Sequence, residues 1–97
     1  MKTMYVYILQ CNDSTYYTGV TNDIERRLAE HSSGVNKTCY TYKRRPVKLL
    51  FFESYSDAVI AIEYEKKIKR WSRRKKEALI KGEYESLPKL SKKHFKS

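Results

Sequence analysis

Hydrophobic and polar residues alternate in two short stretches near the start of the chain, on either side of a polar turn. The first stretch runs from Met4 to Leu9, the second from Thr15 to Val20, and the turn between them is NDS at 12–14. A period of two places successive side chains on opposite faces of a strand. Two such runs around a turn of Asn, Asp and Ser predict an antiparallel β-hairpin.

The predicted hairpin brings two tyrosines together with a glycine. A turn centred on Asn12 places Tyr7 opposite Tyr17, and a turn centred on Asp13 places Tyr7 opposite Gly19. Both registers keep these three residues on one face, whereas a shift by one residue separates them. A glycine inside a strand often marks the close approach of a ligand or another backbone. We therefore interpret this face as a candidate site.

A helix is predicted after the hairpin, from about Asp23 to Ser33. Asn22, with Glu25 three residues later, fits a capping box in which Asn replaces Ser or Thr. Gly34 suits the left-handed conformation that commonly follows the last helical residue. The sequence thus predicts both ends of this helix.

One face of the same helix is apolar and carries Leu28 and His31, with Arg27 at its edge. Spacing alone slightly favours an ordinary surface arginine that pairs with Asp23 or Glu30. A functional cation that faces the tyrosines is the other interpretation.

The segment from Val35 to Pro46 has no useful periodicity. Its cations, Lys37, Lys43, Arg44 and Arg45, are interleaved with threonines and tyrosines. Such a mixture suits a loop that contacts phosphates and stacks on bases. A solvated connector is an equally good interpretation.

A third strand is predicted at Val47–Ser54, and its near-continuous apolar run predicts burial on both faces over most of its length. A helix from about Asp57 to Arg70 follows, with Ser56 as its expected N-cap. The expected buried stripe of that helix is Ile60 or Ala61, Tyr64, Ile68 and Trp71.

Two glutamates on this second helix have different neighbours. Glu63 has three cations within reach, Lys66, Lys67 and Arg70, and is typical of an exposed residue. Glu65 lies at the margin of the apolar face, beside Ala61, with Lys69 one turn later. A carboxylate there costs free energy unless a cation meets it. Glu65 is therefore the better candidate for a metal or catalytic role, and an ordinary ion pair with Lys69 is the alternative.

The run KKIKRWSRRKK at 66–76 holds eight basic residues in eleven and no acid. Ser72 is expected to cap a third helix from about Arg73 to Lys81, ended by Gly82. The run is typical of a solvated face, and it also suits a surface that follows a phosphate backbone.

Composition adds a partner class to this picture. The chain has 97 residues, 40% of them hydrophobic, and a formal net charge of +10. This balance favours a polyanionic partner, most simply nucleic acid, over a membrane surface. We expect a single domain over 1–90, in which Leu87, Pro88 and Leu90 pack on the body, and a basic, flexible tail over 91–97.

Several function classes are excluded by missing motifs. There is no P-loop, GxGxxG, CxxC or nucleophile elbow, and two histidines do not make a multi-histidine zinc site. Cys11 and Cys39 lack metal or redox spacing. No signal peptide or long apolar segment is evident, so we expect reduced thiols and a cytoplasmic location.

Four stretches, in their order along the chain, resemble the GIY-YIG nuclease family. They are YVY at 5–7, YTG at 17–19, TNDIERRL at 21–28 followed by His31, and YEKKIKRW at 64–71. The resemblance covers roughly 4–90 and is greatest to the small stand-alone bacterial members. It implies an α+β fold, with a three-stranded antiparallel sheet (the N-terminal hairpin plus a third strand) flanked by three or more helices.

The resemblance also implies an endonuclease that hydrolyses phosphodiester bonds in DNA or another nucleic acid with Mg²⁺ or Mn²⁺. Its catalytic residues correspond here to Tyr7, Tyr17, Arg27, His31 and Glu65, and Glu65 corresponds to the metal ligand. The residues expected to contact nucleic acid are Gly19, Asn22, Lys37, Arg44, Arg45, Lys69 and Arg70.

As a mechanism, we expect Tyr7 to act as the general base, with Tyr17 and His31 orienting it and the attacking water. A free phenol has a pKa of about 10, so nearby cations have to lower it. Arg27, His31 and the metal are the expected sources of that effect. Gly19 is expected to leave room for the scissile phosphate.

Two other functions fit the same residues. One is a non-catalytic nucleic-acid-binding module on the same fold, and the other is a small protein-interaction module that acts on a ribosomal or repair complex. Since the chain has no room for an additional binding domain, a protein partner is one expected source of substrate specificity.

Overall fold

The computed structural model describes residues 3–82. The expected packing of Leu87, Pro88 and Leu90 and the expected tail over 91–97 lie outside these described residues. The elements, in chain order, are β1 (Met4–Gln10), β2 (Tyr16–Thr21), α1 (Ile24–Ser33), the 3₁₀ turn η1 (Tyr42–Arg44), β3 (Lys48–Tyr55), α2 (Ala58–Arg70) and α3 (Arg73–Lys81).

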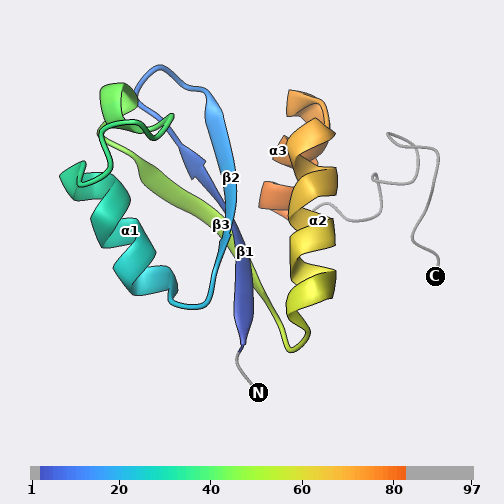
Figure 1. Ribbon diagram of the computed structural model, residues 1–97. Coiled ribbons are helices and arrows are strands. Elements are labelled where there is room, and N and C mark those ends of the chain that lie inside the picture. The colour runs from blue at the N-terminus through green and yellow to red at the C-terminus, as the bar shows by residue number, and fades with distance from the viewer. Residues whose placement is uncertain (1–2, 83–97) are drawn as a thin grey trace.

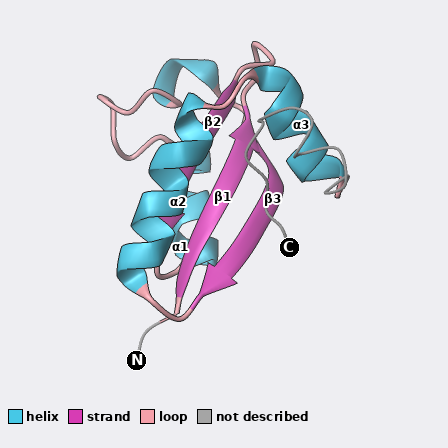
Figure 2. Cartoon of the chain, turned by 90° about the vertical axis from the view of Figure 1, so that its right-hand side faces the viewer, coloured by secondary structure: helices cyan, strands magenta, loops and turns pink. Residues whose placement is uncertain are grey.

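The three strands form one antiparallel sheet in the order β2-β1-β3, with α1 on one face and α2 and α3 on the other (Figures 1 and 2). The predicted α+β fold with a three-stranded sheet is confirmed. β1 is the central strand, so it is paired on both sides and covered on both faces. Its residues from Val6 to Leu9 are accordingly buried.

The hairpin register is the one centred on Asp13. Tyr7 pairs with Gly19, and Leu9 pairs with Tyr17. Ser14 adopts a left-handed φ of 70° in the turn, where its N–H donates to the carbonyl of Cys11 at 2.9 Å. Tyr7, Tyr17 and Gly19 therefore share one face of the sheet, as both of the predicted registers required.

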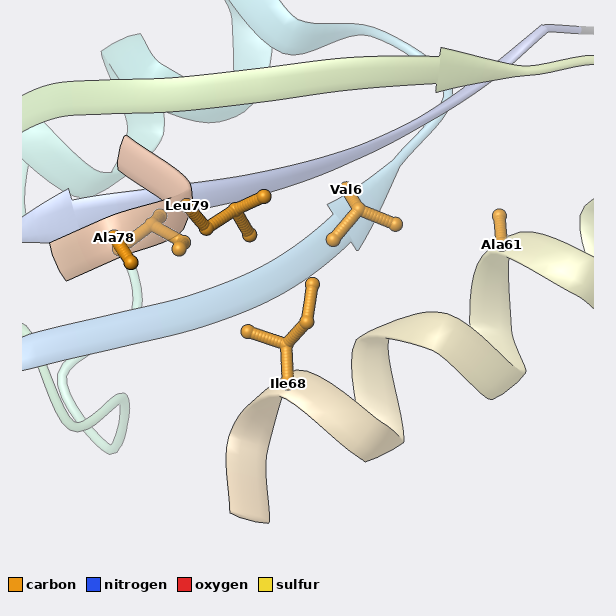
Figure 3. Close-up of a cluster of buried hydrophobic side chains, with 6 residues drawn as sticks. Val6, Ala61, Ile68, Ala78 and Leu79 are labelled. Atoms are coloured by element: carbon orange, nitrogen blue, oxygen red, sulfur yellow. The ribbon is translucent and has the colours of Figure 1, made fainter. Parts of the chain in front are cut away.

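The apolar core lies between the sheet and the pair α2–α3 (Figure 3). β1 contributes Val6 and Ile8, whose side chains alternate with that of Tyr7 and so point to the opposite face. The helices contribute Ala61, Ile68, Ala78 and Leu79. Of the two predicted alternatives in α2, Ala61 is the buried one, because Ile60 is 53% exposed.

Two helix caps differ from the prediction. Asp23, not Asn22, caps α1 and accepts a hydrogen bond from the Arg26 N–H at 3.1 Å. Asp57, not Ser56, caps α2 and accepts from two backbone N–H groups of the first turn. In both cases the chain offers two adjacent polar candidates. The residue that caps the helix is the aspartate directly before the first helical residue.

The other predicted helix ends are confirmed. Gly34 and Gly82 follow α1 and α3 with left-handed φ values of 73° and 77°. The Ser72 side chain caps α3 by accepting from the Lys75 N–H at 3.2 Å.

The prediction that the third strand is buried on both faces is wrong. β3 has no fully buried residue, and Phe52 is 52% exposed. The reason is lateral position, because β3 is an edge strand and the centre of the sheet lies at β1. A bulge also interrupts the β1–β3 pairing, since Ile8 pairs with Phe51 and Leu9 with Leu49.

No helix within residues 3–82 is long and apolar enough to cross a membrane.

Candidate active site

Tyr7 lies directly over Gly19 on the face of the sheet that α1 covers. A Cβ atom at position 19 would lie 2.5 Å from Tyr7 Oη and 2.6 Å from its Cζ, closer than non-bonded atoms approach. The missing side chain of Gly19 thus accommodates the phenol of Tyr7. This is a different use of the glycine from the predicted one, which was to leave room for a phosphate.

Three aromatic rings meet on this face. The centroid of the His31 ring lies 5.1 Å from that of Tyr17 and 6.0 Å from that of Tyr7, both in edge-on geometry. The two tyrosine centroids are 6.3 Å apart. His31 is buried in the last turn of α1, so the apolar face of that helix carries it against the hairpin. The predicted convergence of these three residues is confirmed.

A chain of side-chain contacts leads inward from the Tyr7 hydroxyl. Tyr7 Oη lies 3.0 Å from His31 Nε2, and His31 Nδ1 lies 2.9 Å from Thr41 Oγ1. The Thr41 hydroxyl in turn donates to Cys39 Sγ at 3.5 Å. Thr41 is 1% exposed, so this chain runs through the interior. It joins β1, α1 and the segment between α1 and β3, which lies on the same side of the sheet as α1 (Figure 1).

The protonation tendencies of this cluster follow from burial. Burial raises the pKa of Tyr7 well above the ordinary phenol value, the charge of Tyr17 adds to the increase, and the charge of Arg27 opposes it. Burial likewise raises the pKa of Tyr17. Burial and the charge of Arg27 lower the pKa of His31. The predicted cationic help from His31 is therefore wrong at neutral pH, where the ring is uncharged and offers a lone pair instead.

Arg27 lies at the edge of the cluster. Its Nε is 3.4 Å from Glu30 Oε1, so the ordinary ion pair is present. The same Nε is buried and makes no hydrogen bond within residues 3–82. Its charge nevertheless acts on Tyr7 and His31. The charge of Arg27 beside the two phenols makes its guanidinium a candidate to hold an anion.

A cavity of about 150 Å³ opens beside these groups. Its walls come from β2, α1 and the segment that follows α1. The lining residues are Tyr17, Arg27, Glu30, His31, Gly34, Val35, Asn36, Cys39, Thr41 and Tyr42.

Glu65 lies in the other helical layer, on α2. It is 7% exposed, and its Oε2 lies 2.8 Å from Lys69 Nζ. Burial is the main cause of the raised pKa values of Tyr7 and Tyr17, and the charge of Glu65 raises both further. Glu63, by contrast, is exposed. The structure thus distinguishes the two glutamates by burial and shows the predicted ion pair of Glu65 with Lys69. The metal or catalytic role of Glu65 stays a prediction.

The side chains around Glu65 fit a Mg²⁺ site better than a tetrahedral zinc site. Within residues 3–82 no group of three His, Cys, Asp or Glu side chains is placed to hold a metal. Such a group is what a tetrahedral zinc site requires. A single buried carboxylate suits Mg²⁺, which keeps several waters and takes its remaining ligands from substrate phosphates.

The two arginines predicted to contact nucleic acid from the loop are held by the protein itself. Arg44 Nε lies 3.1 Å from Asp13 Oδ2, and its guanidinium lies 3.9 Å from the centroid of the Tyr40 ring. Arg45 Nε donates to the carbonyl of Tyr42 at 2.9 Å. The Arg44 contact fastens the loop onto the hairpin, and the Arg45 contact lies within the loop itself. Both arginines therefore have a structural role besides any contact with phosphate.

The remaining predicted contact residues lie at different places. Asn22 is exposed at the start of α1, in a surface hollow separate from the cavity at the tyrosines. Lys37 is exposed in the loop, and Lys69 and Arg70 are exposed on α2. Their contacts with nucleic acid stay predictions.

Sequence reasoning did not single out Thr41 and Cys39 as site residues. They lie ten and eight positions after His31, in an aperiodic segment, so no helical or strand spacing links them to it. The sequence offers only a weak indication of their role, which is that a threonine and a cysteine lie close to the interleaved tyrosines of the loop.

Comparison with known proteins places this site in a family. Residues 3–78 match the GIY-YIG catalytic domain. The chain belongs to the GIY-YIG family. This is a family of nucleases that act on nucleic acid, and the resemblance inferred from the four sequence stretches is thereby confirmed.

Related proteins of similar size carry the same domain. A UPF0213 protein of Syntrophus aciditrophicus is 48% identical over 81 residues, which cover 84% of this chain and 93% of the relative. The UPF0213 protein BH0048 of Halalkalibacterium halodurans is 42% identical over 90 residues, covering 90% of this chain and 95% of the relative. These names state no activity.

Two solution NMR structures share the fold. That of the UPF0213 protein BH0048 from Bacillus halodurans has a TM-score of 0.54 at 41% identity and covers 92% of this chain and 97% of its own. That of the protein EF2693 from E. faecalis has a TM-score of 0.57 at 33% identity, and the match covers 100% of this chain and 95% of the other.

Proposed function

We propose that this protein is a metal-dependent endonuclease that hydrolyses phosphodiester bonds in nucleic acid, most simply in DNA. The observation that carries the proposal is the convergence of two phenols, a neutral imidazole and a guanidinium, within the electrostatic reach of a buried carboxylate. The residues are Tyr7, Tyr17, His31, Arg27 and Glu65.

Arg27 is the group proposed to hold the scissile phosphate. Its guanidinium is a planar fork of donors, and its buried Nε makes no hydrogen bond within the described chain. Negative charge grows on the phosphoryl oxygens as water attacks, so these hydrogen bonds strengthen in the transition state. The ion pair with Glu30 keeps the side chain at the rim of the cavity.

Tyr7 is proposed as the general base. Burial keeps its phenol protonated, so the phenol first has to pass its proton to an acceptor. His31 Nε2, at 3.0 Å, is in position to accept it. The resulting phenolate then takes a proton from the attacking water, the new P–O bond forms, and the bond to the leaving oxygen breaks. The leaving oxygen takes a proton from solvent, and His31 returns its proton to solvent. Tyr17 packs against the imidazole edge-on and limits the movement of the ring.

Glu65 is proposed to hold Mg²⁺ or Mn²⁺, whose charge, when bound, stabilises the phosphoryl and leaving oxygens. Its buried position favours this, because a carboxylate with little solvent around it interacts strongly with a cation. Lys69, which pairs with Oε2, is exposed and able to turn toward a phosphate.

The test is cleavage of branched, single-stranded and duplex DNA, and of RNA, with Mg²⁺ or Mn²⁺. Glu65→Ala and Arg27→Ala are expected to lower the rate by about a hundredfold or more, in line with the loss of one transition-state donor. Each has a matched control on the same helix, because Glu63→Ala and Arg26→Ala remove exposed neighbours of the same charge. Cleavage that survives both Glu65→Ala and Arg27→Ala contradicts the proposal.

A non-catalytic nucleic-acid-binding module is the alternative, and the Lys69–Glu65 ion pair favours it. An ammonium group at 2.8 Å from the carboxylate already occupies a position that a metal ion would otherwise take. This alternative predicts salt-sensitive binding without metal-dependent cleavage, and binding that Glu65→Ala leaves unchanged.

A further inference from the structure

The two nitrogens of His31 have different partners, and these partners decide which nitrogen carries the proton. Nε2 faces the Tyr7 hydroxyl at 3.0 Å, and Nδ1 faces the Thr41 hydroxyl at 2.9 Å. Both partners are hydroxyls, each of which donates or accepts. These two contacts alone therefore permit two opposite directions for the chain of hydrogen bonds.

The contact between Thr41 and Cys39 favours one of these two directions. The Thr41 hydroxyl donates its hydrogen to Cys39 Sγ at 3.5 Å. A hydroxyl has one hydrogen, so Thr41 Oγ1 then accepts from the imidazole and cannot donate to it. Cys39 Sγ also lies 3.9 Å from His31 Nδ1, where it is a second acceptor for the same nitrogen. This arrangement favours a proton on His31 Nδ1, with the lone pair on Nε2 and the Tyr7 hydroxyl donating to it. In neutral imidazole, the bond at one nitrogen sets the role of the other.

The surroundings of the sulfur agree with its role as an acceptor. Burial raises the pKa of the Cys39 thiol, but hydrogen bonds from the side chain and backbone of Thr41 and from the Tyr17 hydroxyl outweigh burial, so the pKa lies below its ordinary value. The sulfur is thus the point on which two hydroxyls of the site converge.

We propose that Thr41 and Cys39 are positioning residues that hold His31 as the Nδ1–H tautomer, with the lone pair of Nε2 facing the Tyr7 hydroxyl. The consequence for cleavage rests on the proposed function, because it is the Tyr7 proton that the lone pair accepts. The tautomer itself is a property of the protein without substrate. Nucleic acid and metal are therefore not needed to observe it.

The first test is ¹⁵N NMR of the full chain labelled at histidine, at a pH above the pKa of His31. The expected spectrum has a protonated Nδ1 and an unprotonated Nε2 at His31. Thr41→Val, which keeps the shape and removes the hydroxyl, is expected to shift the ring toward the Nε2–H tautomer. Thr41→Ser, which keeps the hydroxyl, is expected to match the wild type.

Two spectra overturn the proposal: a wild type with the Nε2–H tautomer, or a Thr41→Val variant with unchanged nitrogen shifts. For the sulfur, Cys39→Ala frees the Thr41 hydroxyl to donate to Nδ1 and is expected to raise the Nε2–H fraction. An unchanged tautomer in Cys39→Ala overturns the role given to Cys39.

The second test is single-turnover cleavage. Thr41→Val is expected to lower the single-turnover rate constant roughly ten- to hundredfold, with little change in the half-saturating concentration. The range is taken from partners that orient metal-bound histidines. Thr41→Ser is expected to restore the rate. A wild type that cleaves nothing contradicts the proposed function and leaves the NMR result to decide the tautomer. A wild type that cleaves, with Thr41→Val equally active, overturns the positioning role.

Discussion

The two faces of β1 use the same strand for different purposes. On one face Val6 and Ile8 pack against side chains of α2 and α3 in an apolar cluster. On the other face, one residue away, Tyr7 contacts His31 and lies over Gly19. The packing of the first face depends on how well side chains fill its volume. The chemistry of the second face depends on which groups donate and which accept its hydrogen bonds.

This difference has energetic consequences. A buried aliphatic side chain contributes through the apolar area that it removes from water, about 25 cal/mol per Å². A buried hydrogen bond contributes only about 1 kcal/mol net, and the larger effect is the penalty when one partner is left without the other. The apolar face should therefore govern stability, and the tyrosine face should govern chemistry. Four predictions test that division, from the largest expected effect to the smallest.

Tyr7→Phe is expected to separate activity from stability. It removes the hydroxyl that faces His31 Nε2, and with it the proposed base, so cleavage should fall about 10²- to 10⁴-fold, the usual contribution of general base catalysis. The free energy of unfolding should fall by only about 1 kcal/mol. Rates and urea unfolding curves of one preparation give both quantities. Full activity of this variant would remove Tyr7 from the mechanism.

Ile8→Ala is expected to do the reverse. Ile8 is completely buried in the core cluster, so the truncation should lower the free energy of unfolding by about 2–5 kcal/mol. Cleavage per folded molecule should stay at the wild-type level, because Ile8 points away from the site. Urea unfolding followed by circular dichroism measures the first effect. A specific activity that drops as far as in Tyr7→Phe would show that the two faces are coupled.

Gly19→Ala tests the contact between the two central residues of the site. The new Cβ would meet the Tyr7 ring at 2.5–3.1 Å, so we expect a loss of roughly 1–3 kcal/mol, as for overpacked positions. The same change should be much milder in a Tyr7→Leu background, where the phenol is missing. A double-mutant cycle of unfolding free energies measures this coupling. Equal costs in both backgrounds would mean that the clash with Tyr7 is not the cause.

The pH dependence of stability tests whether His31 is neutral in the folded protein. Burial and Arg27 lower its pKa, whereas Glu30 opposes them, so the folded state binds fewer protons than the unfolded state. The stability due to neutral His31 should be fully present above the unfolded pKa of about 6.5 and be lost as the pH falls below it toward the folded pKa.

The measurement is urea unfolding between pH 7.5 and pH 5.5, in wild type and in His31→Gln. The variant should lose less stability over this interval, because the titrating group is gone. Identical pH dependence in the two proteins would indicate that His31 already titrates normally in the folded state.

Much of the fold could be predicted from local patterns. Alternation around the NDS turn predicts the hairpin, and Gly34, Gly82 and Ser72 mark helix ends that the structure confirms. Periodicity on α2 also distinguishes Glu65 from Glu63. These signals act within a single turn of helix or a single pair of strands, so the residues that carry them are close together in the chain.

Other features depend on contacts between distant segments. The apolar run of β3 is the same whether the strand is central or at an edge, so only the strand order decides its exposure. The choice between Asn22 and Asp23 as the α1 cap depends on which residue the helix begins after.

The amino-acid sequence by itself predicted the helices and strands and carried the resemblance to the family, which implies the five candidate catalytic residues. These signals lie in patterns along one chain segment at a time. Tertiary structure alone decided that His31 is buried, with the Tyr7 hydroxyl at one ring nitrogen and the Thr41 hydroxyl at the other. Burial and hydrogen-bond direction arise only when α1 and the following loop close over the sheet. No periodicity in the sequence records how that closure places one side chain against another.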